Sequence, residues 1–292
     1  MNIWFERFDR YHFFDWVPDA LYLRMRFKQR CGRSLNLAEP KTFNEKLQWL
    51  KLYNRKPEYT VMVDKYKVRE YIAQMIGEEY LIPLLGVWDD PEDIDFDALP
   101  NRFVLKCNHN SGLGMCICKD KSKLDITKVK AELRKGLQQN YYLSSREWPY
   151  KDVPRKIIAE KYMEDASGDL KDYKFYCFNG EMKFVMINSD RNTSKPTRAD
   201  YFDRDFNWLD FTWGYSHAEV HPQKPEQFEK MVAIAEKLAK GLPHIRVDLY
   251  DCNGKIFFGE LTFFDGSGFD KIEPEEWDYK IGNMLELPPK KV

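Results

Sequence analysis

The sequence predicts an α+β protein, in which hairpins of antiparallel strands are mixed with helices. Two segments of the second half, residues 173–187 and 244–264, read as β-hairpins, because apolar strands flank short turns that contain Asn-Gly. Between them, residues 225–242 have the apolar periodicity of an amphipathic helix that ends at Gly241. Hairpins mixed with a helix favour an α+β fold over a doubly wound parallel sheet.

Helices and single strands are expected in the first half of the chain. Thr42 and Glu45 have the spacing of a capping box, which predicts a helix over residues 42–55. Residues 59–77 predict a second helix that ends at Gly77, residues 80–88 a strand or a loop, and residues 89–101 an acidic turn region. A buried strand at 102–107, a helix at 127–143 and a strand at 155–163 follow.

The composition excludes several classes of protein. The chain has 292 residues, which suffices for one large domain or two modest ones. Its net charge of −1 gives no general basic field, so no nucleic-acid partner is expected. The sequence contains no apolar run of about 18 residues, so no transmembrane helix is expected.

Two further features predict a cytoplasmic protein. Residues 1–16 are aromatic and charged and lack the continuous apolar stretch of a signal peptide. They are expected to form a helix packed on its own domain, with an amphipathic contact to a membrane or partner as the alternative. The six cysteines are scattered without a CxxC pair, which predicts reduced and mostly buried thiols.

The hairpin 244–264 carries two acids inside its strands, Asp248 and Glu260. With a three-residue loop at 252–254, Arg246, Asp248, Glu260 and Thr262 point to one face, whereas a two-residue loop breaks this arrangement. Two close carboxylates repel each other unless a positive charge lies between them, and Mg²⁺ prefers carboxylate oxygens together with substrate phosphates. Salt bridges on a solvated sheet face are the alternative explanation.

The stretch "FVLKCNHNSGLGM" is a strand that runs into a glycine-bearing loop. Lys106 ends the strand, Asn108 and Ser111 offer polar groups, and Gly112 and Gly114 let the backbone approach a ligand. Such a loop can present several amides to phosphate, although an ordinary turn between strands explains it equally well.

In order along the chain, these segments resemble the ATP-grasp enzymes, and in particular their TupA-like branch, which is associated with teichuronopeptide and other bacterial surface polysaccharides. The resemblance rests on "VLKCNHNSGLGM", the hinge "AEKYM", and the strand pair "IRVDL" and "FGELTFFDGSG". The flanking stretches "PKTFNEKLQWLKLYN", "DKYKVREYI", "YLIPLLGVWDD" and "DYKFYCFNGE" extend it over residues 38–287.

The resemblance implies an ATP-grasp fold in which two α+β subdomains clasp ATP. The implied division is a helical N-terminal region at 1–95, a subdomain with the glycine loop and hinge at 96–165, and a subdomain with the metal-binding hairpin at 166–292. The implied ATP-binding residues are Lys65, Lys106, Asn108, Ser111, Gly112, Gly114, Glu160, Lys161, Tyr162 and Met163. Arg246 and Lys106 are the implied catalytic residues, and Asp248, Glu260 and Thr262 are the implied Mg²⁺ ligands.

The sequence departs from the family pattern at one metal ligand. The family has Asn two residues after the glutamate, and this chain has Thr262 there, so Asp265 or water is an alternative ligand. The acid that binds the ribose of ATP stays open among Asp165, Asp169 and Asp172.

The chemistry implied by the resemblance is an ATP-dependent ligation. A carboxylate, expected to be a uronic acid or an acidic amino acid of a capsular or cell-wall polysaccharide, is activated as an acyl phosphate and joined to an amine. The partners are therefore a small-molecule or nucleotide-sugar carboxylate and an amine, with peripheral association with polysaccharide machinery as a further expectation. A glycosyltransferase of the same pathways and a non-catalytic nucleotide-binding module are the alternatives.

Overall fold

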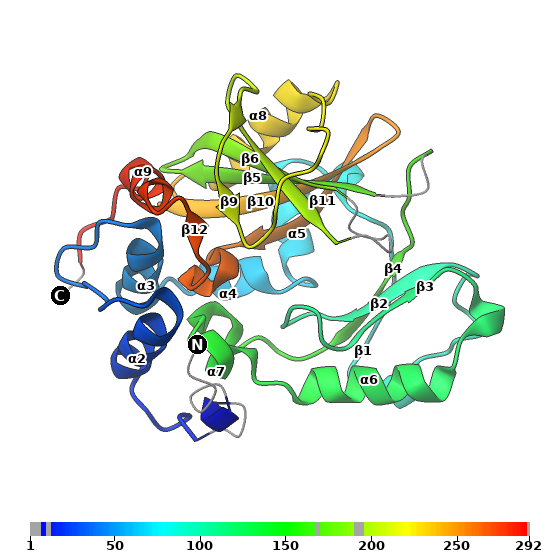
Figure 1. Cartoon of the computed structure of the whole chain (residues 1–292). Helices are drawn as coiled ribbons and strands as arrows, with labels where there is room; N and C mark the ends of the chain where they lie inside the picture. The colour runs from blue at the N-terminus through cyan, green and yellow to red at the C-terminus, as the bar shows by residue number, and fades with distance from the viewer. Residues whose placement is uncertain (1–6, 10–12, 167–169, 190–195, 291–292) are drawn as a thin grey trace. The chain divides into compact units, whose positions relative to one another are not determined.

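A six-stranded and a four-stranded antiparallel sheet organise the chain (Figure 1). The computed structural model describes residues 7–9, 13–166, 170–189 and 196–290. Unit 1 comprises residues 1–55, 143–147 and 171–292, and unit 2 comprises residues 56–142 and 148–170. The expected three-part division at 95/96 and 165/166 stays a prediction, while these compact units divide the chain at other positions.

Unit 1 is built on the six-stranded sheet, whose strand order is β11 (Lys255–Thr262), β10 (His244–Cys252), β5 (Lys171–Phe178), β6 (Glu181–Ser189), β7 (Arg198–Asp203) and β8 (Trp208–Leu209). A short pair, β9 (Thr212–Trp213) with β12 (Ile272–Glu273), lies beside it in the same unit. Its helices are α2 (Asp19–Cys31), α3 (Phe43–Tyr53), α8 (Phe228–Ala239) and α9 (Glu276–Met284).

The two faces of this sheet differ in chemistry. Helix α8 packs on the face that carries Val247 and Phe175, where the rings of Phe175 and Phe228 lie 6.0 Å apart. On the opposite face His244 stacks on Phe178 at 4.8 Å and meets Phe43 of α3 edge-on at 5.1 Å. This second face is aromatic where α3 covers it, and it becomes charged further along β10.

Unit 2 is built on the four-stranded sheet β1 (Leu84–Trp88), β4 (Ile157–Lys161), β2 (Phe103–Cys107) and β3 (Met115–Cys118), in that order. Helix α6 (Ile126–Gln138) runs along this sheet (Figure 1) and supplies Val129 and Leu133 to a core shared with Phe103, Leu105 and Ile157. Helices α4 (Glu58–Val63) and α5 (Val68–Met75) belong to the same unit, and α7 (Tyr141–Ser145) spans a chain boundary between the units.

Two of the predicted helices differ from the structure. Helix α3 has the predicted capping box, in which the Thr42 side chain accepts from the Glu45 backbone N–H. The single helix expected over 59–77 is broken into α4 and α5 around Asp64, whose carboxylate accepts from the Tyr66 backbone N–H at 2.8 Å. Helix α6 starts one residue before the expected Thr127, capped by Asp125, and ends at Gln138 rather than at 143. Helices α2, α7 and α9 and strands β7, β8, β9 and β12 were not predicted.

The turn of the second hairpin was predicted wrongly, yet the predicted shared face is present. Cys252 pairs with Lys255, so the loop has two residues, Asn253 and Gly254, both with positive φ. A β-bulge then lies opposite the step from Asp248 to Leu249 and takes up Gly259, after which Asp248 pairs with Glu260. The extra residue reverses the parity change that the shorter loop introduces, which brings the four side chains back to one face.

Predictions about the N-terminal residues, the cysteines and membrane-spanning helices can be compared with the structure. Residues 1–6 and 10–12 lie outside the described residues. Residues 7–9 are helical, as expected, and Asp9 accepts from the hydroxyl of Tyr22 in α2. Residues 13–16 form a turn with Phe13 and Trp16 exposed, unlike the packed helix expected there. All six cysteines are free thiols. Within the ranges that the structure describes, every helix is too short or too polar to cross a bilayer.

Candidate active site

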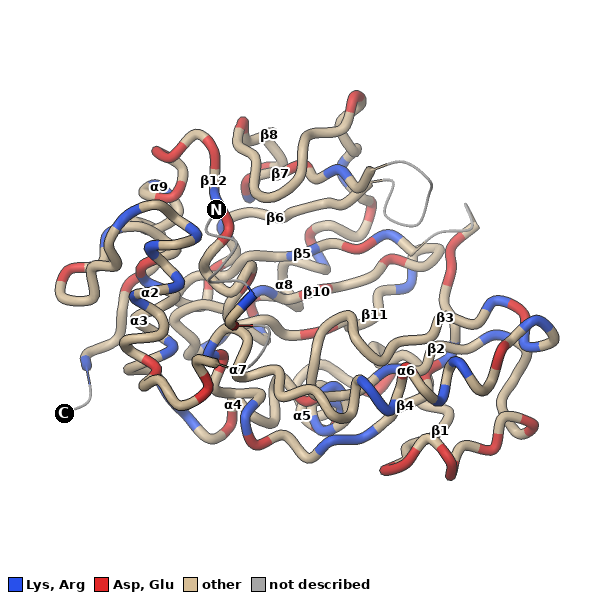
Figure 2. The backbone as a smooth tube through the Cα atoms, turned by 60° about the horizontal axis from the view of Figure 1, so that its bottom comes forward, with Lys and Arg blue, Asp and Glu red and all other residues tan. Residues whose placement is uncertain are grey.

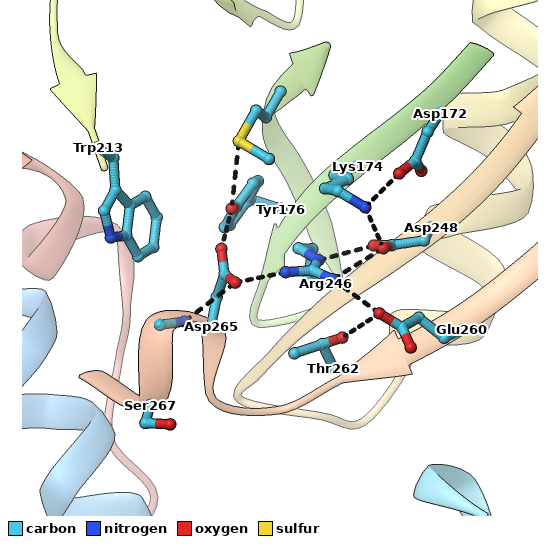
Figure 3. Close-up of polar contacts among 12 residues, drawn as sticks. Asp172, Lys174, Tyr176, Trp213, Arg246, Asp248, Glu260, Thr262, Asp265 and Ser267 are labelled. Carbon is cyan, nitrogen blue, oxygen red and sulfur yellow. Dashed lines mark hydrogen bonds and ion pairs between the residues drawn. The ribbon is translucent and has the colours of Figure 1, made fainter. Parts of the chain in front are cut away.

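Arg246 is the centre of a charged cluster on the β10–β11 face of unit 1 (Figure 3). Its Nε and Nη2 donate to the two carboxylate oxygens of Asp248 at 2.7 and 2.8 Å. Nη2 also donates to Glu260 Oε1 at 3.0 Å, and Nη1 donates to Asp265 Oδ1. One guanidinium therefore holds three carboxylates in a fixed arrangement, which the five N–H groups of arginine allow.

The neighbouring strand β5 adds a second cation to the cluster. Lys174 pairs with Asp248 across the sheet, and its Nζ donates to Asp248 Oδ2 and to Asp172 Oδ2, each at 2.6 Å. Asp172 and Asp248 are both 2% exposed. Of the three candidates for a ribose-binding acid, Asp172 is therefore engaged by a buried lysine, and Asp169 lies outside the described residues.

Asp265 extends the cluster away from the hairpin. Its second oxygen accepts from the hydroxyl of Tyr176, whose ring stacks on Phe184 at 4.4 Å. Burial and the adjacent Asp265 carboxylate hold the pKa of Tyr176 well above its usual value, so this phenol keeps its proton as a donor. Asp265 therefore stands between Arg246 and Tyr176 in this structure (Figure 3).

The turn after β11 that carries Asp265 has an unusual backbone, because Gly266, Ser267 and Gly268 all have positive φ. Two side chains of helix α3 hold this turn through hydrogen bonds. Gln48 Nε2 donates to the carbonyl of Gly268 at 2.7 Å, and the buried Lys51 Nζ donates to that of Ser267 at 2.7 Å. Side chains from a distant helix thus hold a conformation that a serine seldom adopts.

The cluster carries an excess of negative charge. Among the described residues it comprises four carboxylates, those of Asp172, Asp248, Glu260 and Asp265, and two cations, Lys174 and Arg246, which gives these six side chains a formal sum of −2. Burial by itself would raise the pKa of Asp248, but Arg246 and Lys174 outweigh burial and hold this pKa below its usual range. Asp248 is accordingly ionised at neutral pH.

This charge balance fits a divalent cation. Mg²⁺ binds carboxylate oxygens and usually keeps waters and substrate phosphates as its other ligands, so a site needs only one or two acids. Glu260 has a side chain that is 37% exposed, whereas both oxygens of Asp248 are engaged by Arg246 and Lys174. No preformed cage of three acid, His or Cys side chains is found in the described part of the chain.

The structure places Thr262 on the predicted face, next to the acids. It pairs with Arg246 across the hairpin, and its hydroxyl lies 3.5 Å from Glu260 Oε1. Its role as a third metal ligand stays a prediction, as does the alternative role of Asp265, whose two oxygens are engaged by Arg246 and Tyr176.

In unit 2 the predicted lysine and hinge acid lie on one face of the sheet. Lys106 Nζ lies 2.6 Å from Glu160 Oε2, and Arg69 Nη1 lies 3.4 Å from Glu160 Oε1. Arg69 also donates to the carbonyl of Ile82 at 2.8 Å. This face is opposite the one covered by α6, because Leu105 and Ala159 of the same strands belong to the α6 core.

The glycine loop is closed by backbone contacts. Cys107 N–H donates to the carbonyl of Gly114 at 3.1 Å, and both Gly112 and Gly114 have positive φ. A Cβ on Gly114 would lie 2.8 Å from the Cα of Gly136 in α6, so the loop backbone packs directly on that helix. Ser111 and Gly112 are exposed at the tip of the loop.

Two of the predicted ATP-binding residues help to hold the loop within unit 2. Asn108 is fully buried, and its amide donates to Asp64 at 2.7 Å and to the carbonyl of Pro154 at 2.9 Å. Lys65 Nζ donates to the carbonyl of Asn110 at 2.5 Å. These contacts link the start of α5 to the loop, and a role of either residue toward a nucleotide stays a prediction.

The predicted hinge follows strand β4. Lys161 ends the strand, and its backbone N–H donates to the carbonyl of Pro83 at 2.9 Å. The ring of Tyr162 lies 4.3 Å from the guanidinium of Arg102. Met163 follows, partly buried and outside regular secondary structure. The chain thus leaves the strand after Lys161, whose side chain is exposed, and the ring of Tyr162 is held against Arg102. The adenine contacts of this hinge stay a prediction.

Lys174 and Tyr176 of the charged cluster were not predicted as site residues, and Asp172 was predicted only as a candidate for the ribose-binding acid. They alternate along β5, which the sequence did place in a hairpin with β6. The missing information was the pairing of β5 with β10, which joins segments more than 60 residues apart. The alternation of Asp172, Lys174 and Tyr176 in an otherwise apolar strand was the available signal.

Comparison with known protein families gives a match that covers most of the chain. Residues 45–286 match the sequence model of a family described as TupA-like ATPgrasp. Among curated proteins, a lipoteichoic acid synthase of Staphylococcus saprophyticus is 28% identical over 99 residues, which is 33% of this chain and 14% of that protein.

Several solved structures are similar to this chain. A D-alanine–D-alanine ligase from Bacillus anthracis in complex with ATP has a TM-score of 0.41 and 19% identity, over 70% of this chain and 54% of that one. The D-alanine–D-alanine ligase from Helicobacter pylori has a TM-score of 0.45 and 13% identity, over 83% and 69%. A D-cycloserine synthetase has a TM-score of 0.43 and 16% identity, over 79% and 72%. The chain spans about half the length of the first of these structures.

Proposed function

Because this chain belongs to the TupA-like ATP-grasp family, we propose that it joins a carboxylate to an amine at the expense of ATP. Family membership confirms the resemblance seen in the sequence, the α+β ATP-grasp fold and the class of enzyme, an ATP-grasp ligase. The carboxylate is proposed to be a uronic acid or acidic amino acid of a bacterial capsular or cell-wall polysaccharide, and action in the cytoplasm stays part of the proposal.

The proposed reaction has two steps. A carboxylate oxygen of the substrate forms a bond to the γ-phosphorus of ATP, and the bond from that phosphorus to the β–γ bridging oxygen breaks, which gives an acyl phosphate and ADP. The amine then attacks the acyl carbon, phosphate leaves, and the nitrogen loses a proton to give the amide. Both steps develop negative charge on oxygen, so fixed cations near the phosphates are the main contribution that a protein can make.

The observation that carries the proposal is the arrangement around Arg246. Its guanidinium is held by three carboxylates at once and is therefore fixed before any ligand arrives. A fixed cation costs no reorganisation when charge develops on the transferred phosphoryl group. When bound, Mg²⁺ would supply further positive charge, and the carboxylates of Glu260 and Asp248, which share one face beside Arg246, fit this cation as ligands.

In unit 2 the proposed nucleotide contacts are Lys106 for the phosphates, the loop 108–114 through its backbone, and residues 160–163 for the base. Glu160 holds Lys106 at 2.6 Å and so fixes the direction of this ammonium group. Lys106→Ala is therefore expected to weaken ATP binding more than Lys65→Ala, since Lys65 Nζ is already engaged by the Asn110 carbonyl.

One observation supports a second candidate, a nucleotide-binding module without phosphoryl transfer. Both oxygens of Asp248 are bound by Arg246 and Lys174, so this acid reaches a metal only if one of these cations moves. A module of this kind binds ATP but releases no ADP, which separates it from the ligase.

The experiment is an assay of ADP release with Mg²⁺ and ATP across a panel of uronic acids and acidic amino acids, with hydroxylamine as the amine. An acyl phosphate reacts with hydroxylamine to give a hydroxamate, so a ligase gives ADP and hydroxamate in equal amounts with at least one carboxylate. Transfer of sugar from a nucleotide-sugar, without ADP or hydroxamate, would instead identify a glycosyltransferase and refute the proposal.

A pair of matched variants ties the activity to the cluster. Glu260→Gln removes the most exposed acid of the cluster and is expected to abolish most ADP release, because it removes a metal ligand rather than core volume. Glu181→Gln alters an exposed glutamate of the same unit that pairs with Lys183, and it should leave the rate unchanged. Equal rates in the two variants would show that the hairpin acids are structural.

A further inference from the structure

The turn before helix α2 and the outer side of this helix expose large apolar side chains. Phe13 is 62% exposed, Trp16 81% and Leu21 52%. In the described ranges only one other large apolar side chain, Val220, is more than half exposed. Three of the four thus lie within nine residues of sequence, although apolar side chains on monomeric proteins are usually scattered singly.

These side chains are not needed to hold the helix in place. Helix α2 already buries Tyr22, Leu23 and Phe27 on its inner side, and Val17 anchors the preceding turn. Leu21 points the other way on the helix, and Trp16 lies in the turn just before it. The exposed set is therefore a second apolar surface, separate from the core.

Basic side chains border this surface. Arg24 and Lys28 follow Leu21 at spacings of three and seven residues, so all three lie on one side of the helix, and both basic residues are exposed. The three other Lys or Arg of residues 13–34 form ion pairs with acids, so Arg24 and Lys28 are the basic residues that this side of the helix offers to a partner. Figure 2 marks the basic positions of α2.

A small groove accompanies the basic residues. Its volume is about 260 Å³, and it is lined by Arg24, Met25, Lys28, Ser34 and Leu35. Two cations, a hydroxyl and apolar walls suit a phosphate group that carries an apolar chain. The exposed aromatic residues and the groove belong to the same turn–helix segment, which we call the α2 surface (residues 13–35).

We propose that the α2 surface docks on an anionic phospholipid membrane, with Phe13, Trp16 and Leu21 in the interface and Arg24 and Lys28 on lipid phosphates. Apolar and tryptophan side chains next to lysine and arginine are the combination by which helices lie on anionic bilayers. Each basic residue near such a surface gains electrostatic attraction, which a protein partner of neutral charge would not supply. The proposal is independent of the reaction proposed above.

The test measures the partitioning of the full chain onto phosphatidylcholine vesicles with and without phosphatidylglycerol, by co-sedimentation. Wild type should bind the anionic vesicles and lose most of this binding in high salt. Trp16→Ser should bind about tenfold more weakly, which corresponds to about 1.4 kcal/mol, because a large apolar side chain is no longer buried. Lys28→Ala should bind about fivefold more weakly, and only on anionic vesicles.

Two control variants make the test specific. Val220→Ser removes an equally exposed apolar side chain elsewhere in unit 1, and Lys128→Ala removes an exposed lysine of α6; both should bind like wild type. The proposal is overturned if wild type binds vesicles with and without phosphatidylglycerol equally, or binds neither. It is also overturned if Val220→Ser loses as much binding as Trp16→Ser. A wild-type dimer in sedimentation that Trp16→Ser converts to a monomer, without vesicle binding, would overturn it in favour of a second copy of the chain.

Discussion

Replacing Arg246 by glutamine should destabilise the protein far more than an ordinary lost surface ion pair. The variant loses two hydrogen bonds to Asp248, one to Glu260 and one to Asp265, and the cluster is left with Lys174 as its only cation among the described residues. The excess negative charge then rises from two to three. Removing one partner of a buried ion pair costs about 3–5 kcal/mol, so a loss of this size is expected.

Urea unfolding at neutral pH, with and without Mg²⁺, measures this loss. The matched control is Arg204→Gln, which breaks a 2.8 Å pair with Glu229 in which both side chains are exposed, and it should cost about 0–1 kcal/mol. Mg²⁺ should stabilise Arg246→Gln more than wild type, because it replaces a missing positive charge among free carboxylates. An Arg246→Gln variant as stable as Arg204→Gln would refute the account of the cluster.

Two further predictions concern the glycine loop and a buried histidine. Gly114→Ala should cost about 2–4 kcal/mol in urea unfolding, since its Cβ would meet Gly136. Gly112→Ala, which adds only backbone strain, should cost about 1 kcal/mol; equal losses would contradict the predicted packing. Burial lowers the pKa of His244 from 6.5 to about 4, so its contribution to stability is present above pH 6.5 and is lost as the pH falls toward 4, by about 1.4 kcal/mol per pH unit. His244→Phe should flatten the dependence of unfolding free energy on pH in this window, and an unchanged slope would exclude this histidine as its source.

Much of the fold could be predicted because its signals are local. The capping box of α3, the Asn-Gly turn of the β5–β6 hairpin and the periodicity of α8 each depend on residues within one segment. The break between α4 and α5 was missed because Asp64 forms a local bond with the backbone of Tyr66 that competes with the helix. Helix α2 was missed because its apolar periodicity is weak, since Leu21 is exposed while its neighbours Tyr22 and Leu23 are buried.

The site was predictable in part for the same reason. Arg246, Asp248, Glu260 and Thr262 share a hairpin, so their common face followed from alternation, although the loop length assumed for it was wrong. Lys174 and Tyr176 join them only through the pairing of β5 with β10, and alternation within one strand does not say which strand lies beside it.

The turn that presents Asp265 could not be derived from its own sequence. "DGSG" predicts a turn, but three successive residues with positive φ are maintained here by Gln48 and Lys51 of a helix more than 200 residues earlier. Such support depends on tertiary packing, which propensity and periodicity do not report.

The bulge at Gly259 has a consequence for how this hairpin tolerates insertions and deletions. Gly259 is the residue of β11 that has no partner, because Phe258 pairs with Leu249 and Glu260 pairs with Asp248. Deletion of Gly259 would therefore leave both pairs in a regular ladder and keep Glu260 on the face of Arg246. A second deletion between the turn and Glu260 would find no spare residue and would carry Glu260 to the opposite face, so in genetic terms this stretch is expected to accept the loss of one codon but not of two.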